Sequence, residues 1–217
     1  MVDLILALDV LNEKRAKCIA KEVKDYISAI KVNYPLILSS DISIIRELSE
    51  IKPVIADFKI ADIPYISSLI AEIAFKNEAS AIIVHGFSGR ESVKAVLEVA
   101  RMYNGEVYVV TELTSSSEYF SNISIKIAMM AKELGCDGII APGNKPERIR
   151  EFRKVVGDLK ILCPGIGVQG GDLREVLANG ADGIIVGRII YDSKNPKSTA
   201  KELFDIIKKV RNSEDNQ

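Results

Sequence analysis

The sequence predicts an α/β protein, and specifically a single (β/α)8 TIM barrel. Short runs of β-branched and other apolar residues alternate with stretches of helical periodicity along the chain, which is typical of βαβ units around a parallel sheet. Eight such runs occur, the number that closes the barrel. An open doubly wound sheet is the alternative, but the strand count and the lack of a GxGxxG turn after the first run disfavour it.

The predicted strands are runs such as "LILALDV", "VIADFKI" and "GIIVGR", in which Val, Ile and Leu dominate. They begin near Leu4, Ala29, Val54, Ala81, Val107, Gly138, Lys160 and Gly183.

The segments between these strands carry apolar stripes at helical spacing. The stripes comprise Ile42, Ile45, Leu48 and Ile51, then Ile66, Leu69, Ile70 and Ile73, and finally Leu203, Phe204, Ile206, Ile207 and Val210. Asp41 and Asp172 are candidate N-caps.

Composition favours one cytoplasmic barrel domain over residues 1–211, with a polar tail over 212–217. The chain has 217 residues, is 47% hydrophobic and 27% charged, and has a net charge of -1. This balance predicts no nucleic-acid partner, and no apolar run approaches the roughly 18 residues of a membrane span. The three cysteines, Cys18, Cys136 and Cys163, lack CxxC spacing and are expected to be reduced, mostly buried thiols.

Polar residues interrupt the apolar pattern where the predicted strands end. A barrel enzyme places its chemistry at the carboxyl ends of its strands, so these residues are the candidates for function. They are Asp9, Lys31, Asp57, Lys59, His85, Thr111 and Thr114.

Asp57 and Lys59 are two residues apart in one predicted strand, so their side chains share a face while Phe58 and Ile60 face the helices. Together with Lys31 they place several charges in the mouth of the barrel. Removing charges from water costs several kcal/mol unless they pair closely. The cluster therefore suggests a functional site.

Two glycine-rich stretches predict a phosphate site. "PGIGVQGGD" (Pro164 to Asp172) follows the seventh strand, and "VGR" (Val186 to Arg188) ends the eighth. Loops after these two strands commonly bind phosphate in this architecture. Glycines allow the backbone N–H groups to approach an anion, and Arg188 can clamp it bidentately.

His85 is the single histidine, and "VHGF" at a strand end more often holds a packed ring than a general base. No His/Cys cluster has the spacing of metal ligands. We therefore expect the chemistry to depend on carboxylates and lysines.

Taken together, these motifs resemble the orotidine 5'-phosphate decarboxylases, in the compact form of their archaeal branch. The resemblance covers essentially the whole chain. It is carried by "LALD", "IKVN", "DFKIADIP", "IIVHGF", "TELT", "PGIGVQGGD" and "IIVGR".

The resemblance implies a homodimer that converts orotidine 5'-phosphate to UMP and CO2 without metal or organic cofactor. It implies a charge network of Lys31, Asp57 and Lys59, with Lys59 as proton donor to C6 and Asp62 reaching into the partner's site. It also implies that Thr114, where relatives often have Ser, holds the pyrimidine. The implied substrate contacts are Asp9, Lys31, Asp57, Ile63, Thr114, Pro164, Gln169, Gly170, Gly187 and Arg188. One departure is Ile66, where relatives often have Thr.

Two alternatives remain. The related sugar-phosphate enzymes 3-keto-L-gulonate 6-phosphate decarboxylase and hexulose-6-phosphate synthase share the D-x-K-x-x-D pattern but use Mg²⁺, with an acidic ligand where this chain has Lys31. Lysine is a poor partner for a dication. The second alternative is a barrel that binds a phosphorylated ligand without catalysis, because fold alone does not establish function.

Overall fold

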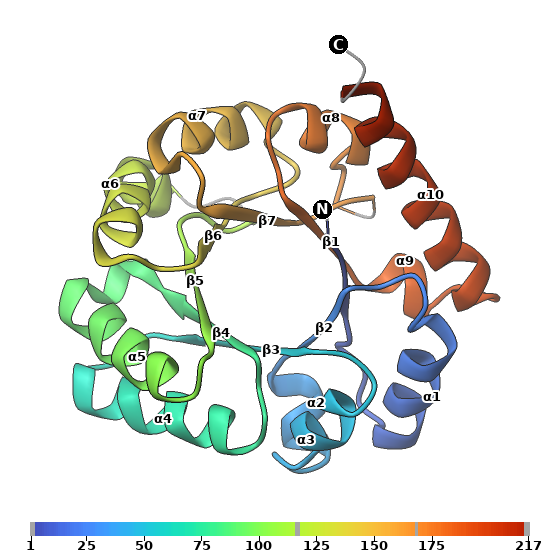
Figure 1. Ribbon diagram of the computed structural model, residues 1–217, viewed down its shortest axis with the longest axis horizontal. Helices are drawn as coiled ribbons and strands as arrows, with labels where there is room; N and C mark the ends of the chain where they lie inside the picture. The colour runs from blue at the N-terminus through green and yellow to red at the C-terminus, as the bar shows by residue number, and fades with distance from the viewer. Residues whose placement is uncertain (1–2, 116–117, 168, 215–217) are drawn as a thin grey trace.

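The computed structural model describes residues 3–115, 118–167 and 169–214, and these form a closed barrel of parallel strands in the order β1 to β8 (Figure 1). Strand β1 pairs with both β2 and β8, which closes the sheet. All eight predicted strands are confirmed. They are β1 (Asp3–Ala7), β2 (Ala29–Val32), β3 (Val54–Ile60), β4 (Ala81–His85), β5 (Glu106–Val110), β6 (Gly138–Ile140), β7 (Lys160–Pro164) and β8 (Gly183–Val186).

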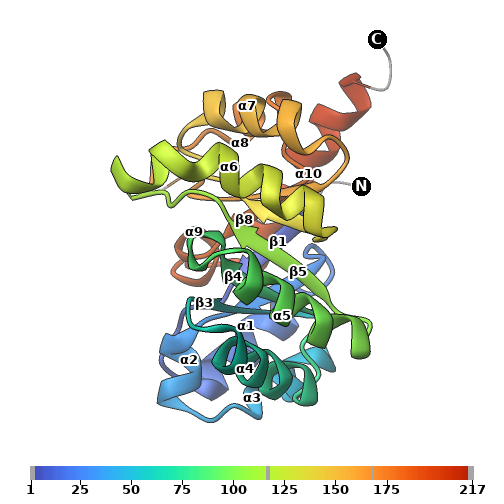
Figure 2. The same ribbon diagram turned by 90° about the vertical axis from the view of Figure 1, so that its left-hand side faces the viewer.

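Helices surround the barrel, with α6 and α7 on one side and α3 and α4 on the opposite side (Figure 2). The helices are α1 (Glu13–Val23), α2 (Tyr34–Ser39), α3 (Ile44–Ser49), α4 (Pro64–Lys76), α5 (Arg90–Met102), α6 (Glu118–Leu134), α7 (Pro146–Val156), α8 (Leu173–Ala178), α9 (Arg188–Tyr191) and α10 (Pro196–Glu214), with a 3-10 turn η1 (Gly86–Ser88). The three predicted stripes lie in α3, α4 and α10, although Ile42 and Ile51 fall just outside α3.

The two predicted N-caps have different outcomes. Asp172 caps α8 by accepting a hydrogen bond from the backbone N–H of Glu175 at 3.0 Å, as predicted. The prediction for Asp41 is wrong, because the N-cap of α3 is Ser43. Asp41 instead accepts from the N–H of Ser43 at 2.9 Å and shapes the turn before the helix.

The core has two layers, one inside the barrel and one between the barrel and its helices. The inner layer is Ile5, Ala7, Ile55, Ala81, Ile83, Tyr108, Val110, Ile140, Leu162 and Ile185. Phe58 and Ile60 lie in the outer layer, as predicted. Burying each large side chain contributes about 1.5–3 kcal/mol, so the two layers supply most of the driving force that holds the strand ends in place.

Helix α4 presents part of its apolar stripe away from the core. Its buried residues are Ser67, Ala71, Ala74 and Phe75, and the small ones among them let the helix lie close to its neighbours. Of the predicted stripe, Ile70 packs against the core, whereas Leu69 is 39% and Ile73 is 50% exposed. Ile63, just before the helix, is 63% exposed, and Tyr65, in its first turn, is 68% exposed. We refer to Ile63, Tyr65, Leu69 and Ile73 as the α4 face.

Three further features bear on the predictions from composition. No helix in the described part of the chain is long and apolar enough to cross a membrane. Cys136 and Cys163 are buried and Cys18 is exposed. Helix α10 continues to Glu214, so the first three residues of the predicted tail are helical, and residues 215–217 lie outside the described ranges.

Candidate active site

A cavity of about 240 Å³ lies at the carboxyl end of the barrel. Nine of the sequence-predicted site residues line it: Asp9, Lys31, Asp57, Lys59, Thr114, Pro164, Gln169, Gly187 and Arg188. They come from segments spread along the chain, and the closed sheet brings them together because all its strands end at the same rim.

Asp57 is held between two ammonium groups at the base of this site. The Nζ atom of Lys31 lies 2.7 Å from Asp57 Oδ2, and the Nζ atom of Lys59 lies 2.8 Å from both carboxylate oxygens. Lys31 also contacts Asp9 Oδ1 at 3.5 Å. The side chains of Asp57 and Lys31 are only 4% and 7% exposed, so this network is largely removed from water.

The network keeps Asp57 and Lys31 charged at neutral pH. Burial alone would raise the pKa of Asp57, but the charges of Lys31 and Lys59 outweigh burial and lower it. Burial alone would lower the pKa of Lys31, but Asp57 and Asp9 outweigh it and the pKa is raised. Buried ion pairs are weak evidence for stability because desolvation offsets their attraction. A buried network that stays charged despite this desolvation cost is typical of a functional site.

Lys59 reaches Asp57 through an irregular backbone. Between the paired residues Ala56 and Ile60, strand β3 has three residues where β4 has one, so the ladder shifts here. Lys59 has φ +43°, the left-handed region that side chains rarely adopt. The predicted contact between Asp57 and Lys59 is confirmed. It depends on the bulge in β3 as well as on the alternation of side chains along the strand.

The loop after β7 is built from glycines that side chains cannot replace. Gly165, Gly167 and Gly170 all have positive φ. A Cβ on Gly171 would meet the carbonyl oxygens of Gly143 and Gly165 at 2.6 and 2.8 Å. The loop therefore lies against the β6–α7 segment and stays narrow. Val168 lies outside the described residues.

Thr114 and Arg188 also line the cavity. A Cβ on Gly165 would meet Thr114 Cγ2 at 2.7 Å, so the two segments touch. The carbonyl of Thr114 accepts a hydrogen bond from Asn144 Nδ2 at 3.0 Å. Arg188 begins α9 directly after Gly187. A Cβ on Gly187 would lie 3.1 Å from the carbonyl oxygen of Ala7, so a larger residue would not fit easily there.

Sequence reasoning missed Glu112, which also lines the cavity. Its carboxylate is almost fully buried and accepts from Lys145 Nζ at 2.6 Å and Arg148 Nε at 3.0 Å. It lies two residues after the end of β5, so the strand-end rule that selected Thr111 and Thr114 could have found it. Thr111 itself is structural, since its buried hydroxyl donates to the Ile140 carbonyl at 2.9 Å.

His85 is a packed ring, as expected from its sequence context. It ends β4 and contacts the rings of Phe87 and Phe120 at centroid distances of 4.8 and 5.6 Å. Its Nδ1 atom is buried without a hydrogen-bond partner among the described residues. Burial, and then the charge of Lys59, lower the pKa of His85 to about 4, so the ring is neutral at physiological pH.

Three predicted residues lie outside the cavity wall of their own chain: Asp62, Ile63 and Gly170. Asp62 is exposed, and its carboxylate accepts from the N–H of Ile63 at 2.7 Å. Its carbonyl accepts from the hydroxyls of Ser67 and Ser92, which fixes the turn before α4. Gly170 is exposed next to Gln169, which does line the cavity.

Within the described residues, no group of three or more His, Cys, Asp or Glu side chains has the arrangement of a metal site. The three carboxylates that line the cavity, Asp9, Asp57 and Glu112, are each paired with a lysine or arginine.

Comparison with known proteins agrees on one family. The sequence model described as "Orotidine 5'-phosphate decarboxylase / HUMPS family" matches residues 3–203. The orotidine 5'-phosphate decarboxylase of Methanococcoides burtonii is 48% identical over 205 residues, covering 93% of this chain and 95% of the relative. That of Methanocaldococcus jannaschii is 46% identical over 215 residues, covering 96% and 100%.

Solved structures show the same likeness. The crystal structure of the Methanocaldococcus jannaschii orotidine 5'-monophosphate decarboxylase complexed with the inhibitor BMP superposes with a TM-score of 0.91 at 46% identity, covering 94% of this chain and 98% of that one. The enzyme from Sulfolobus solfataricus superposes with a TM-score of 0.84 at 29% identity, covering 97% and 99%.

Proposed function

Because this chain belongs to the orotidine 5'-phosphate decarboxylase / HUMPS family, we propose that it is an orotidine 5'-phosphate decarboxylase. It converts orotidine 5'-phosphate to UMP and CO2 in pyrimidine biosynthesis. The observation that carries the proposal is the Lys31–Asp57–Lys59 network in a cavity that Gln169 and Arg188 also line.

Lys59 performs the central step. The bond between C6 of the pyrimidine and its carboxylate breaks, CO2 leaves, and the electron pair stays on C6. The ammonium of Lys59 stabilises this carbanion, and one of its protons then passes to C6 to give UMP. A charge held in place before the reaction needs no reorganisation during it, which makes such stabilisation effective.

Asp57 supports this step in two ways. It accepts hydrogen bonds from both the Lys59 and Lys31 ammonium groups and so holds the proton donor in place. It also lies beside the departing carboxylate, where repulsion is relieved as CO2 leaves.

The remaining proposed contacts hold the substrate. Arg188, Gln169, Gly170 and Gly187 bind the phosphate, far from the reacting carbon, and this remote binding energy orders the site. Asp9 and Lys31 contact the ribose. Thr114, Pro164 and, from the partner, Ile63 contact the base.

We also propose that the working form is a homodimer in which Asp62 enters the partner's site. Asp62 is exposed and lies outside the cavity of its own chain. The exposed α4 face follows it directly in sequence, and apolar surface of this kind is typical of an interface. Burying the α4 face against a second copy brings Asp62 to the rim of the other barrel.

We further propose one barrel domain over residues 1–211 that acts in the cytoplasm. The buried thiols of Cys136 and Cys163 support this location, because unpaired cysteines persist in reducing compartments.

The Mg²⁺-dependent sugar-phosphate activity is the weaker candidate. Lys31 stands where those enzymes carry an acidic ligand, and its ammonium already occupies Asp57 at 2.7 Å. A dication would be repelled from this position. A non-catalytic binder would have no use for a desolvated network that costs several kcal/mol to bury.

The test is the loss of orotidine 5'-phosphate absorbance on adding purified protein, with and without EDTA. Turnover to UMP at an equal rate in both samples is expected. Activity that disappears with EDTA would favour the sugar-phosphate enzymes, and binding of UMP without turnover would favour a binder.

A further inference from the structure

Tyr34 contacts Phe58 in two ways at once. Its ring stacks on the Phe58 ring with centroids 5.5 Å apart and planes 16° from parallel. Its hydroxyl donates a hydrogen bond to the Phe58 carbonyl at 2.8 Å. Tyr34 is itself fixed as the first residue of α2, where its N–H donates to Asn33 Oδ1 at 2.7 Å.

Phe58 is the residue between Asp57 and Lys59, at the centre of the β3 bulge. The next residue, Lys59, has φ +43°. A left-handed conformation costs a non-glycine residue about 1–3 kcal/mol and persists only where the surroundings impose it. Some contact near Lys59 must therefore hold this backbone against relaxation.

The carbonyl of Phe58 is in the right place for such a contact. It belongs to the same peptide plane as the N–H of Lys59. Relaxing the φ of Lys59 by turning this plane also swings the Phe58 oxygen away from its present direction. A hydrogen bond to that oxygen opposes the rotation directly.

We propose that Tyr34 is a positioning residue, whose hydroxyl holds the Phe58–Lys59 peptide in its strained orientation and so keeps the Lys59 ammonium on Asp57. The inference rests on the proposed function for its effect on turnover, but the geometry it predicts is independent of the reaction. It explains why a tyrosine stands beside the site without lining the cavity.

The variant Tyr34→Phe keeps the ring stack and removes only the hydroxyl. We expect kcat for orotidine 5'-phosphate to fall about 10- to 100-fold, because a displacement of about 1 Å at a reacting group can cost this much. KM should stay within about twofold of wild type, since the phosphate contacts are untouched. A general loss of structure would instead lower the thermal midpoint.

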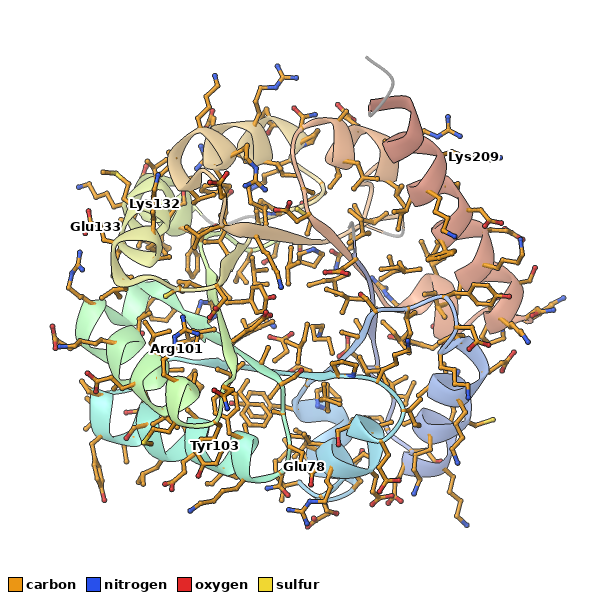
Figure 3. The ribbon with its side chains drawn as sticks, in the orientation of Figure 1. Glu78, Arg101, Tyr103, Lys132, Glu133 and Lys209 are labelled. Carbon is orange, nitrogen blue, oxygen red and sulfur yellow. The ribbon has the colours of Figure 1, made fainter. Side chains whose placement is uncertain are left out.

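Tyr103→Phe is the matched control. Tyr103 stacks on Phe75 with centroids 5.8 Å apart and planes 13° from parallel, which closely reproduces the Tyr34–Phe58 pair. It lies in the outer helical layer, away from the centre of the barrel (Figure 3). Its variant should keep the wild-type kcat.

A crystal structure of Tyr34→Phe separates this inference from the proposed function. We expect Lys59 to have moved to negative φ, with its Nζ beyond hydrogen-bonding distance of Asp57. Unchanged Lys59 geometry, or an unchanged kcat, would overturn the role of Tyr34. A wild-type protein without turnover would overturn the proposed function, and the Lys59 geometry of the variant would still decide for or against Tyr34.

Discussion

At the scale of single residues, the site depends on a carboxylate that two ammonium groups share. Asp57 keeps its negative charge although it is buried, because Lys31 and Lys59 lie within 2.8 Å of it. The two lysines are not equivalent. The side chain of Lys31 is 7% exposed, whereas that of Lys59 is 34% exposed at the cavity.

Lys59→Ala tests the proton donor. We expect kcat to fall by about 10³-fold or more, because both carbanion stabilisation and protonation are lost. UMP affinity should change much less, because the phosphate contacts remain. Steady-state kinetics and UMP titration measure the two effects.

Lys201→Ala is the control for Lys59→Ala, since Lys201 is 56% exposed and pairs with Asp205 on α10. Its kinetics should match wild type. Near-normal turnover in Lys59→Ala would contradict the assignment of Lys59 as the proton donor.

His85 makes a separate prediction about pH. Its pKa is lowered from 6.5 to about 4 in the folded protein, so the unfolded chain takes up the proton first as pH falls. The contribution of His85 to the free energy of unfolding is therefore fully present above about pH 7 and is lost as pH falls towards 4. His85→Phe keeps an aromatic ring and removes the titration.

Urea unfolding at pH 7 and pH 5 measures the effect of His85→Phe. The chain has a single histidine, so the difference between the two proteins reports the titration of His85. Between pH 7 and pH 5, the free energy of unfolding should fall by roughly 1–2 kcal/mol more in the wild-type protein than in the variant. An equal loss in both would show that the ring is not held neutral.

At the scale of elements, glycines decide where the loop after β7 can lie. Gly171→Ala would place a Cβ against two backbone carbonyls, which cannot move aside as a side chain can. We expect the loop to shift and KM for orotidine 5'-phosphate to rise about tenfold or more, with kcat less affected. Steady-state kinetics with UMP inhibition measure this.

Gly135→Ala controls for the cost of replacing a glycine. Gly135 lies in the turn between α6 and β6, has φ +73° and has open space around its Cβ position. Its variant should lower the thermal midpoint through backbone strain but leave KM unchanged. Equal KM in Gly171→Ala and wild type would contradict the assigned role of the loop.

At the scale of the whole molecule, the barrel brings distant segments to one rim, and Asp62 lies outside the cavity of its own chain. The exposed α4 face begins immediately after this residue. In the proposed homodimer, two-fold symmetry would bury the same face on both subunits and bring each Asp62 to the other subunit's site.

Mixing variant chains tests the shared site. Lys59→Ala and Asp62→Ala are each expected to be nearly inactive alone. A mixed dimer contains one site with Lys59 from one chain and Asp62 from the other, so equal mixing should restore about a quarter of wild-type activity if subunits exchange at random. Heterodimers that form without activity would show that Asp62 serves its own chain.

The sequence by itself determined the eight strands and nine of the cavity residues. Local runs of apolar residues predict the strands. Functional residues of a barrel lie at the carboxyl ends of its strands, and this rule selects residues such as Asp57 and Lys59. Both signals are local, so neither requires knowledge of which segments meet. The same rule would also have selected Glu112, which was not predicted.

The tertiary structure alone decided which side of α4 faces the core, where Asp62 lies, and how Lys59 reaches Asp57. The apolar stripe of α4 has helical spacing, yet Leu69 and Ile73 are exposed, and most of the fully buried residues of the helix are small. The bulge in β3 leaves no mark in the side-chain pattern, because a backbone dihedral is set by contacts such as that of Tyr34 with the Phe58 carbonyl. Such contacts join segments more than twenty residues apart, and only folding brings them together.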